Sequence, residues 1–152
     1  MQTKVLMVCL GNICRSPLAE GILQAKLPQE DFLVDSAGTG DWHVGESPDQ
    51  RSIAVARKYG IDLTTQRARQ FKKSDFSTFD YIFVMDQSNY NNVIQLAANP
   101  EEIQKVRLLL DVIHPDKKAE VPDPYYGGPD GFEHVFQLVD EACTLIAKAL
   151  KS

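Results

Sequence analysis

The feature that most constrains this chain is the segment C-L-G-N-I-C-R-S-P at residues 9–17, between an apolar run and a helical pattern. The run at 5–8 (V-L-M-V) is unbroken, as in a strand buried on both faces of a parallel sheet. Ser16-Pro17 matches a helix N-cap followed by proline at the first helical position, and apolar residues then repeat at helical spacing. The sequence therefore predicts a strand, a short loop and a helix, with a cysteine and an arginine at opposite ends of the loop.

A loop of this kind suits a tetrahedral oxyanion. Gly11 lets the backbone curl, so that several amide N–H groups point inward where the helix N-terminus adds its positive end. Arg15 can hold two oxygens of the anion with its guanidinium fork, a geometry that lysine lacks. Cys9 would lie at the floor of this cup, where the amides, the helix dipole and Arg15 stabilise a thiolate. We therefore expect Cys9 to attack a bound phosphoryl group.

Strands and helices alternate along the rest of the chain. In chain order, we expect a strand at 32–34, a helix at 47–60, a strand at 79–85, a helix at 87–99, a strand at 106–110 and a helix at 132–150. This alternation predicts a doubly wound α/β domain with a mainly parallel sheet, in which ligands bind beyond the carboxyl ends of the strands. The polar residues expected at those ends are Cys9, Ser36, Asp86 and Asp111.

Length, charge and cysteine content narrow the class of protein. A chain of 152 residues is expected to form one domain, at 1–152. The net charge of −5 argues against nucleic acid and anionic membranes as partners, and no apolar run approaches the ~20 residues of a membrane span. Three cysteines do not make a disulfide framework. We therefore expect a cytoplasmic protein in a reducing compartment.

The reaction needs a proton donor for the leaving oxygen, so a carboxylic acid should lie opposite the cup. Three aspartates compete for this role. Asp86 and Asp111 follow expected strands, whereas Asp123 lies between two prolines in extended backbone on a loop that could project over the site. The chemistry of the residues by itself leaves this choice open.

Several other residues have plainer interpretations. Arg67 and Arg69 lie in an expected loop and are interpreted as solvated surface residues. Cys143 falls on the apolar face of the last helix and is interpreted as a core residue. Ser16 is expected to cap the first helix, and its hydroxyl can also donate a hydrogen bond to the Cys9 thiolate.

The segment at 9–17 closely resembles the phosphate-binding loop of the low-molecular-weight protein tyrosine phosphatases. The resemblance covers essentially the whole chain, through D-S-A-G-T at 35–39, F-D-Y-I-F-V-M-D at 79–86 and D-P-Y-Y-G-G at 123–128. It implies a four-stranded parallel sheet with helices on both faces, the phosphate-binding loop after the first strand, and no metal or cofactor. It also implies hydrolysis of protein phosphotyrosine and small aryl phosphates through a cysteinyl-phosphate.

The resemblance also assigns roles to residues. Cys9 is the implied nucleophile, Arg15 the phosphate clamp and Asp123 the general acid and base. The implied phosphate-binding residues are Leu10, Gly11, Asn12, Ile13, Cys14, Arg15 and Ser16, with support from Asn12, Ser16, Ser36 and Asp86. The expected walls of the substrate pocket are Leu10, Ile13, Trp42, Tyr125 and Tyr126. Gln66 departs from the pattern of many bacterial relatives, which have histidine there.

The pocket walls favour an aryl phosphate. A deep apolar slot suits phosphotyrosine better than the shorter phosphoserine, and relatives that act on phosphoarginine typically carry threonine at the position of Ile13. The expected partner is therefore a tyrosine-phosphorylated protein, with the enzyme itself a monomer or weakly self-associating. Cys14 suggests redox sensitivity, because a sulfenic acid on Cys9 would condense with a thiol five residues away.

Three other functions would use a similar loop. An arsenate reductase of the same fold normally needs further cysteines on a flexible segment, and only Cys143 is left for that task. A phosphocysteine carrier domain also places a cysteine after its first strand, but it requires neither Arg15 nor a paired acid. A phosphate-binding module without turnover would not need Cys9, Arg15 and Asp123 together.

Overall fold

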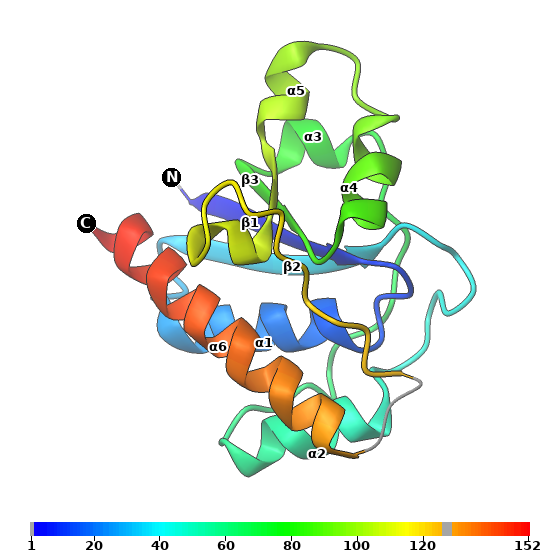
Figure 1. The fold of residues 1–152 in the computed structure, drawn as a ribbon, viewed down its shortest axis with the longest axis vertical. Helices are drawn as coiled ribbons and strands as arrows, with labels where there is room; N and C mark the ends of the chain where they lie inside the picture. Colours follow the sequence, from blue (N-terminus) through cyan, green and yellow to red (C-terminus); the bar gives the residue numbers. More distant parts are fainter. Residues whose placement is uncertain (1, 126–128) are drawn as a thin grey trace.

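Four parallel strands form the centre of the molecule in the computed structural model, which describes residues 2–125 and 129–152 (Figure 1). These strands are β1 (Thr3–Cys9), β2 (Phe32–Gly38), β3 (Tyr81–Val84) and β4 (Val106–Leu108). Their spatial order is β2-β1-β3-β4, so β1 has parallel neighbours on both sides. The apolar run at 5–8 is fully buried, as its composition predicted. The predicted α/β class and parallel sheet are confirmed.

Helices cover both faces of the sheet. On one face lie α1 (Arg15–Lys26) and α6 (Pro129–Lys151), with α2 (Gln50–Lys58) packed beside them (Figure 1). The other face carries the shorter helices α3 (Asp75–Thr78), α4 (Gln87–Ile94) and α5 (Pro100–Gln104). The sheet is therefore covered on both faces, as parallel sheets require.

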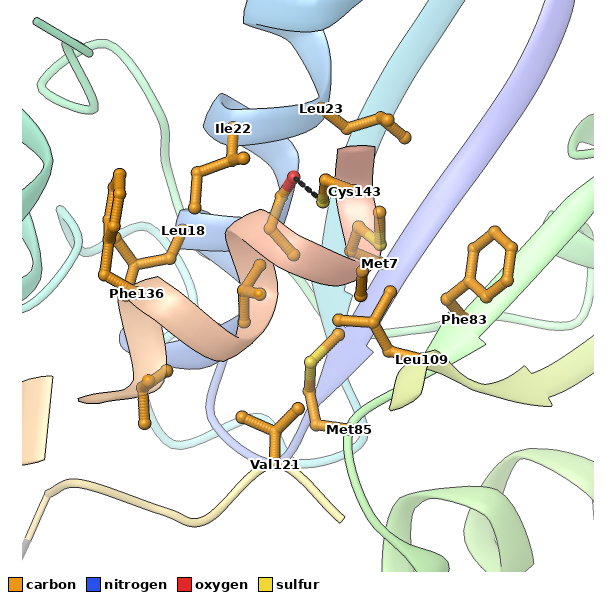
Figure 2. Close-up of a cluster of buried hydrophobic side chains, with 14 of the residues drawn as sticks. Met7, Leu18, Ile22, Leu23, Phe83, Met85, Leu109, Val121, Phe136 and Cys143 are labelled. Carbon is orange, nitrogen blue, oxygen red and sulfur yellow. Dashed lines mark hydrogen bonds between the residues drawn. The ribbon is translucent and has the colours of Figure 1, made fainter. Parts of the chain in front are cut away.

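Alternate residues of β1 point into two separate cores. Met7 packs with α1 and α6 residues, including Leu18 and Phe136, in the cluster that Figure 2 shows. Leu6 and Val8 point the other way, into a cluster under α3 and α4. Cys143 belongs to the first cluster, where it is fully buried and its Sγ lies 3.8 Å from the carbonyl oxygen of Ala19 (Figure 2). The interpretation of Cys143 as a core residue is confirmed.

Two predicted helix starts were wrong. Helix α1 begins at Arg15 with Cys14 at the N-cap position, so Ser16 lies inside the first turn and does not cap the helix. Helix α2 begins at Gln50, because the side chain of Asp49 accepts the N–H of Arg51 and so outcompetes the Ser47-Pro48 pair.

The middle of the chain also differs from the prediction. The helix expected at 87–99 ends early, at Ile94. A further helix that was not predicted, α5, follows it, and the side chain of Asn99 caps this helix by accepting the N–H of Glu102. The strand expected at 106–110 ends at Leu108 and passes into a 3-10 turn, η1 (Leu109–Val112). Among the described residues, no helix is both long and apolar enough to cross a membrane.

Candidate active site

The loop between β1 and α1 forms one wall of a cavity of about 310 Å³. The cavity brings together most residues of the predicted site, and its lining is Cys9, Leu10, Gly11, Ile13, Cys14, Arg15, Trp42, His43, Asp123 and Tyr125. His43 was not among the predicted residues, and only its position next to Trp42 could have suggested it. Tyr126, a predicted wall residue, lies outside the described residues.

A chain of hydrogen bonds runs from Cys9 into the protein interior. The Sγ of Cys9 lies 3.0 Å from the hydroxyl oxygen of Ser16. The Asn12 amide donates to Ser16 Oγ at 2.8 Å and to Ser36 Oγ at 3.0 Å, and Ser36 in turn donates to Glu20 Oε1 at 2.6 Å. Because Ser16 accepts from Asn12, its own proton is left to donate to the sulfur. The Ser16 hydroxyl therefore points its proton at the Cys9 sulfur.

Asn12 holds the shape of the loop. Its φ of 57° lies in the left-handed region, which asparagine tolerates better than most side chains. Its Oδ1 accepts the backbone N–H of Arg69 at 3.0 Å, which ties the loop to the segment after α2. The Arg69 guanidinium in turn pairs with Asp35 and Asp75. The interpretation of Arg69 as a solvated residue was therefore wrong, whereas Arg67 is exposed as expected.

Arg15 is nearly buried, with 3% of its side chain exposed, and carboxylates surround it. Its Nη1 donates to Asp86 Oδ2 at 2.7 Å and to the carbonyl of Val121 at 3.0 Å, and its Nη2 lies 3.7 Å from Asp123 Oδ2. Burial works against the charge, but the electrostatic effects of Cys9, Asp86 and Asp123 outweigh it and raise the pKa of Arg15. The guanidinium thus remains a fixed cation beside the cavity.

The structure separates the three competing aspartates. Asp86 and Asp123 both meet Arg15, whereas Asp111 lies in η1, where it pairs with Arg107 and accepts the N–H of Asp116. Asp86 also caps α4 through a reciprocal pair of hydrogen bonds with Asn89, so its carboxylate is committed to structure. Asp123 lines the cavity and is 41% exposed.

Aromatic and imidazole rings form the outer wall. Trp42 is 67% exposed, yet its ring lies against Gly40, where an added Cβ would come within 1.9 Å of it. The His43 ring packs against Gly11 of the loop, and its Nδ1 lies 3.1 Å from Glu46 Oε2.

Three further polar groups lie close to the loop. Burial raises the pKa of Glu20 to about 7, and no periodicity in the sequence marked this glutamate as buried. Gln66 donates to the carbonyl of Pro17 at 3.1 Å, while its Oε1 is buried with no hydrogen-bond partner among the described residues. Burial, with smaller contributions from Asp49 and Cys9, raises the pKa of Cys14 to about 12.

Comparison with known proteins places the chain in a family. The family model described as low molecular weight phosphotyrosine protein phosphatase matches residues 4–152. A putative low molecular weight protein-tyrosine-phosphatase of Synechocystis sp. is 46% identical over 144 residues, which span 92% of this chain and 91% of the relative.

Solved structures agree with this match. A protein tyrosine phosphatase from Entamoeba histolytica is similar with a TM-score of 0.92 and 38% identity, covering 99% of this chain and 97% of that chain. A Drosophila arginine phosphatase is similar with a TM-score of 0.89 and 36% identity, covering 99% of each chain. The chain therefore belongs to the low molecular weight phosphotyrosine protein phosphatase family and is a hydrolytic enzyme.

Proposed function

We propose that this enzyme hydrolyses protein phosphotyrosine and small aryl phosphates through a cysteinyl-phosphate on Cys9. The observation that carries the proposal is that Cys9, Arg15 and Asp123, three residues with complementary chemistry, line one cavity. A cytoplasmic location, where a catalytic thiol stays reduced, is part of this proposal.

In the first step, the Cys9 thiolate attacks phosphorus, so that an S–P bond forms as the bond to the leaving oxygen breaks. Asp123 gives its proton to that oxygen. In the second step, a water oxygen attacks phosphorus while the Asp123 carboxylate takes a proton from the water. The S–P bond then breaks, and inorganic phosphate and the Cys9 thiolate are released.

The remaining residues of the cup stabilise charge in both steps. The inward amides of residues 10–16 and the Arg15 fork would bind the three non-bridging oxygens of the phosphoryl group. Asp86 holds Arg15 in place with its 2.7 Å contact. Ser16, whose proton is free to face the sulfur, would stabilise the thiolate as it leaves in the second step.

The walls of the cavity support an aryl substrate. Ile13, Trp42 and Tyr125 provide apolar surface along the cavity, which suits a phenyl ring. Since a Drosophila arginine phosphatase shares the fold, the fold by itself does not choose between the two substrates. We expect phosphotyrosine peptides to be hydrolysed much faster than phosphoarginine peptides, and equal rates would contradict this part of the proposal.

We also propose that Cys14 protects Cys9 from irreversible oxidation through a reversible disulfide. Both thiols are buried, and both belong to the loop residues that line the cavity. Peroxide treatment followed by a thiol reductant should restore activity in the parent enzyme but not in Cys14→Ser. Full recovery in that variant would contradict the proposal.

The first experiment measures hydrolysis of p-nitrophenyl phosphate at mildly acidic pH in excess EDTA. The parent enzyme should turn over without added metal, and Cys9→Ser should show no turnover although it still binds inorganic phosphate. No turnover in the reduced parent would contradict the proposal, and arsenate reduction would then be tested.

A further inference from the structure

The N-terminus of α2 is fastened to the phosphate-binding loop. The backbone N–H of Asp49 donates to the carbonyl of Ile13 at 2.7 Å, and the hydroxyl of Ser52 donates to the carbonyl of Cys14 at 3.3 Å. Both acceptors belong to the loop that lines the cavity. The first turn of α2 therefore keeps a fixed position relative to the cup.

Arg51, in that first turn, connects this anchored helix to the segment that carries Asp123. Its Nε donates to Asp49 Oδ1 and its Nη2 donates to Asp49 Oδ2, both at 3.0 Å. This pair of bonds fixes the plane of the guanidinium. Its Nη1 donates to the carbonyl of Tyr125 at 3.1 Å. The guanidinium carbon also lies 4.6 Å from the ring centroid of Phe132 and 5.3 Å from that of Tyr125. All three nitrogens of the guanidinium therefore donate a hydrogen bond, and its positive charge lies near the faces of both aromatic rings.

Tyr125 in turn fixes the carboxylate of Asp123. The backbone N–H of Tyr125 donates to Asp123 Oδ1 at 3.0 Å, while Oδ2 faces Arg15 Nη2 at 3.7 Å. Asp123 is 41% exposed, so packing restrains it little. The position of its carboxylate depends on the peptide backbone at Tyr125, and that backbone is held by Arg51.

We propose that Arg51 is a positioning residue that holds the Asp123 carboxyl at the distance from the cup that proton transfer requires. The inference rests on the proposed role of Asp123 as the general acid. Lysine cannot replace Arg51, because one ammonium group does not provide a planar fork for Asp49 together with a third donor for Tyr125.

A misplaced general acid has a signature that a loosened structure does not share. p-Nitrophenolate is a stable anion that leaves without a proton, whereas phenolate, like the tyrosine side chain, needs one as the P–O bond breaks. Loss of acid positioning therefore lowers kcat/KM for phenyl phosphate much more than for p-nitrophenyl phosphate. Damage to the cup would lower both equally, because both substrates carry the same phosphoryl group.

The experiment measures kcat/KM for both substrates in the parent, Arg51→Gln, Arg51→Lys and the control Arg67→Gln. Arg67 is exposed and donates to the carbonyls of Thr64 and Gln66 in its own loop. We expect Arg51→Gln to lose about tenfold on phenyl phosphate, a part of the ~10²–10⁴-fold that a general acid supplies, and about twofold on p-nitrophenyl phosphate. Arg51→Lys should show the same imbalance although it keeps the charge beside Asp49. The control and the inhibition constant for inorganic phosphate should not change.

Asp123→Asn, alone and combined with Arg51→Gln, completes the test. If Arg51 acts through Asp123, the ratio of kcat/KM for the two substrates in the double variant should equal that in Asp123→Asn. Equal losses on both substrates in Arg51→Gln, or an additive loss in the double variant, would overturn the inference about Arg51 while the role of Asp123 stands. No imbalance in Asp123→Asn would overturn both, and loss of turnover in the parent would already have shown that the proposed function fails.

Discussion

The two sides of the cavity are built differently. On the cup side, Cys9, Asn12 and Arg15 are each no more than 3% exposed, and hydrogen bonds to neighbouring segments hold them in place. On the opposite side, Trp42 is 67% and Tyr125 39% exposed. The ring of Trp42 lies against Gly40, and Arg51 donates to the backbone carbonyl of Tyr125.

This difference corresponds to what each side must bind. The phosphoryl group is the same in every substrate, so a single buried and preorganised set of hydrogen-bond donors fits all of them. The leaving group belongs to a protein surface, so the side that meets it must stay open and is made from loops. Changes on the cup side should therefore affect all substrates and the stability of the protein, whereas changes on the open side should affect the choice of substrate.

The largest effect is expected for Arg15→Lys, which tests the cup side directly. Lysine keeps the charge but loses the fork, so we expect kcat/KM to fall by about a thousandfold, near the upper limit for removing one preorganised donor. The loss should be equal for phenyl phosphate and p-nitrophenyl phosphate, with Arg67→Lys as the control. An unequal loss would break the distinction between the two sides.

Substitution of Glu20 tests whether burying a carboxyl group on the cup side makes the free energy of unfolding depend on pH. Burial raises the pKa of Glu20 from 4.5 to about 7, against the hydrogen bond from Ser36 and the charge of Arg69, and with a smaller contribution from Asp35. Folding therefore takes up a proton between these pH values, so the stability due to the protonated group declines as the pH rises through about 7.

The variant Glu20→Gln should lack this decline. Its free energy of unfolding should rise relative to that of the parent by about 3 kcal/mol between acidic and mildly alkaline pH, at ~1.4 kcal/mol per pKa unit. Urea unfolding of both proteins at about pH 5 and about pH 8 measures this difference. A difference that does not depend on pH would mean that Glu20 has the same pKa in the folded and unfolded states.

Two substitutions of Asn12 separate the contribution of its hydrogen bonds to stability from that of its left-handed backbone conformation. Asn12→Ala loses the hydrogen bonds to Ser16, Ser36 and Arg69 and also forces alanine to a φ of 57°, so we expect a loss of about 2 kcal/mol in stability. Asn12→Gly loses the same bonds without the strain and should be about 1 kcal/mol more stable than the alanine variant. Thermal unfolding measures both, and equal stabilities would show that the left-handed conformation carries no cost here.

The smallest effect is expected on the open side, from Gly40→Ala. The new methyl group would occupy the space of the Trp42 ring, so the ring must move. We expect KM for p-nitrophenyl phosphate to rise about fivefold, equivalent to ~1 kcal/mol of lost apolar contact, while inhibition by inorganic phosphate is unchanged. Trp42→Ala should give the same rise, and the double variant should add nothing. A change in phosphate inhibition would show that the two sides are not independent.

Much of the fold and the site was predictable, because the information is local. A buried strand, a loop with Cys9 and Arg15 at its ends and a helix with apolar residues at helical spacing follow each other within 22 residues, from Val5 to Lys26. Their patterns are read without knowing the rest of the chain. The alternation of strands and helices then leads to a parallel sheet, since few other topologies bury such strands on both faces. The family resemblance rests on the same local motifs.

The predictions that were wrong have two causes, which are local competition for helix caps and contacts from other elements of the fold. Ser16 has a typical capping sequence but lies inside α1, next to Cys9 and Asn12. Arg69 follows a polar loop pattern, yet Asp35 and Asp75 from other elements hold it.

The sequence by itself determined the order of the four strands and the longer helices, and the chemical groups at the end of the first strand, because backbone propensity and hydrophobic period act over short distances. Only the tertiary structure decided how those groups are supported. Asp86 rather than Asp111 meets Arg15, Glu20 closes the network behind the loop, and Arg51 joins α2 to the segment that carries Asp123. The physical reason is that a hydrogen bond depends on distance in space, which residues 71 or 74 positions apart acquire only when the sheet and its helices have packed.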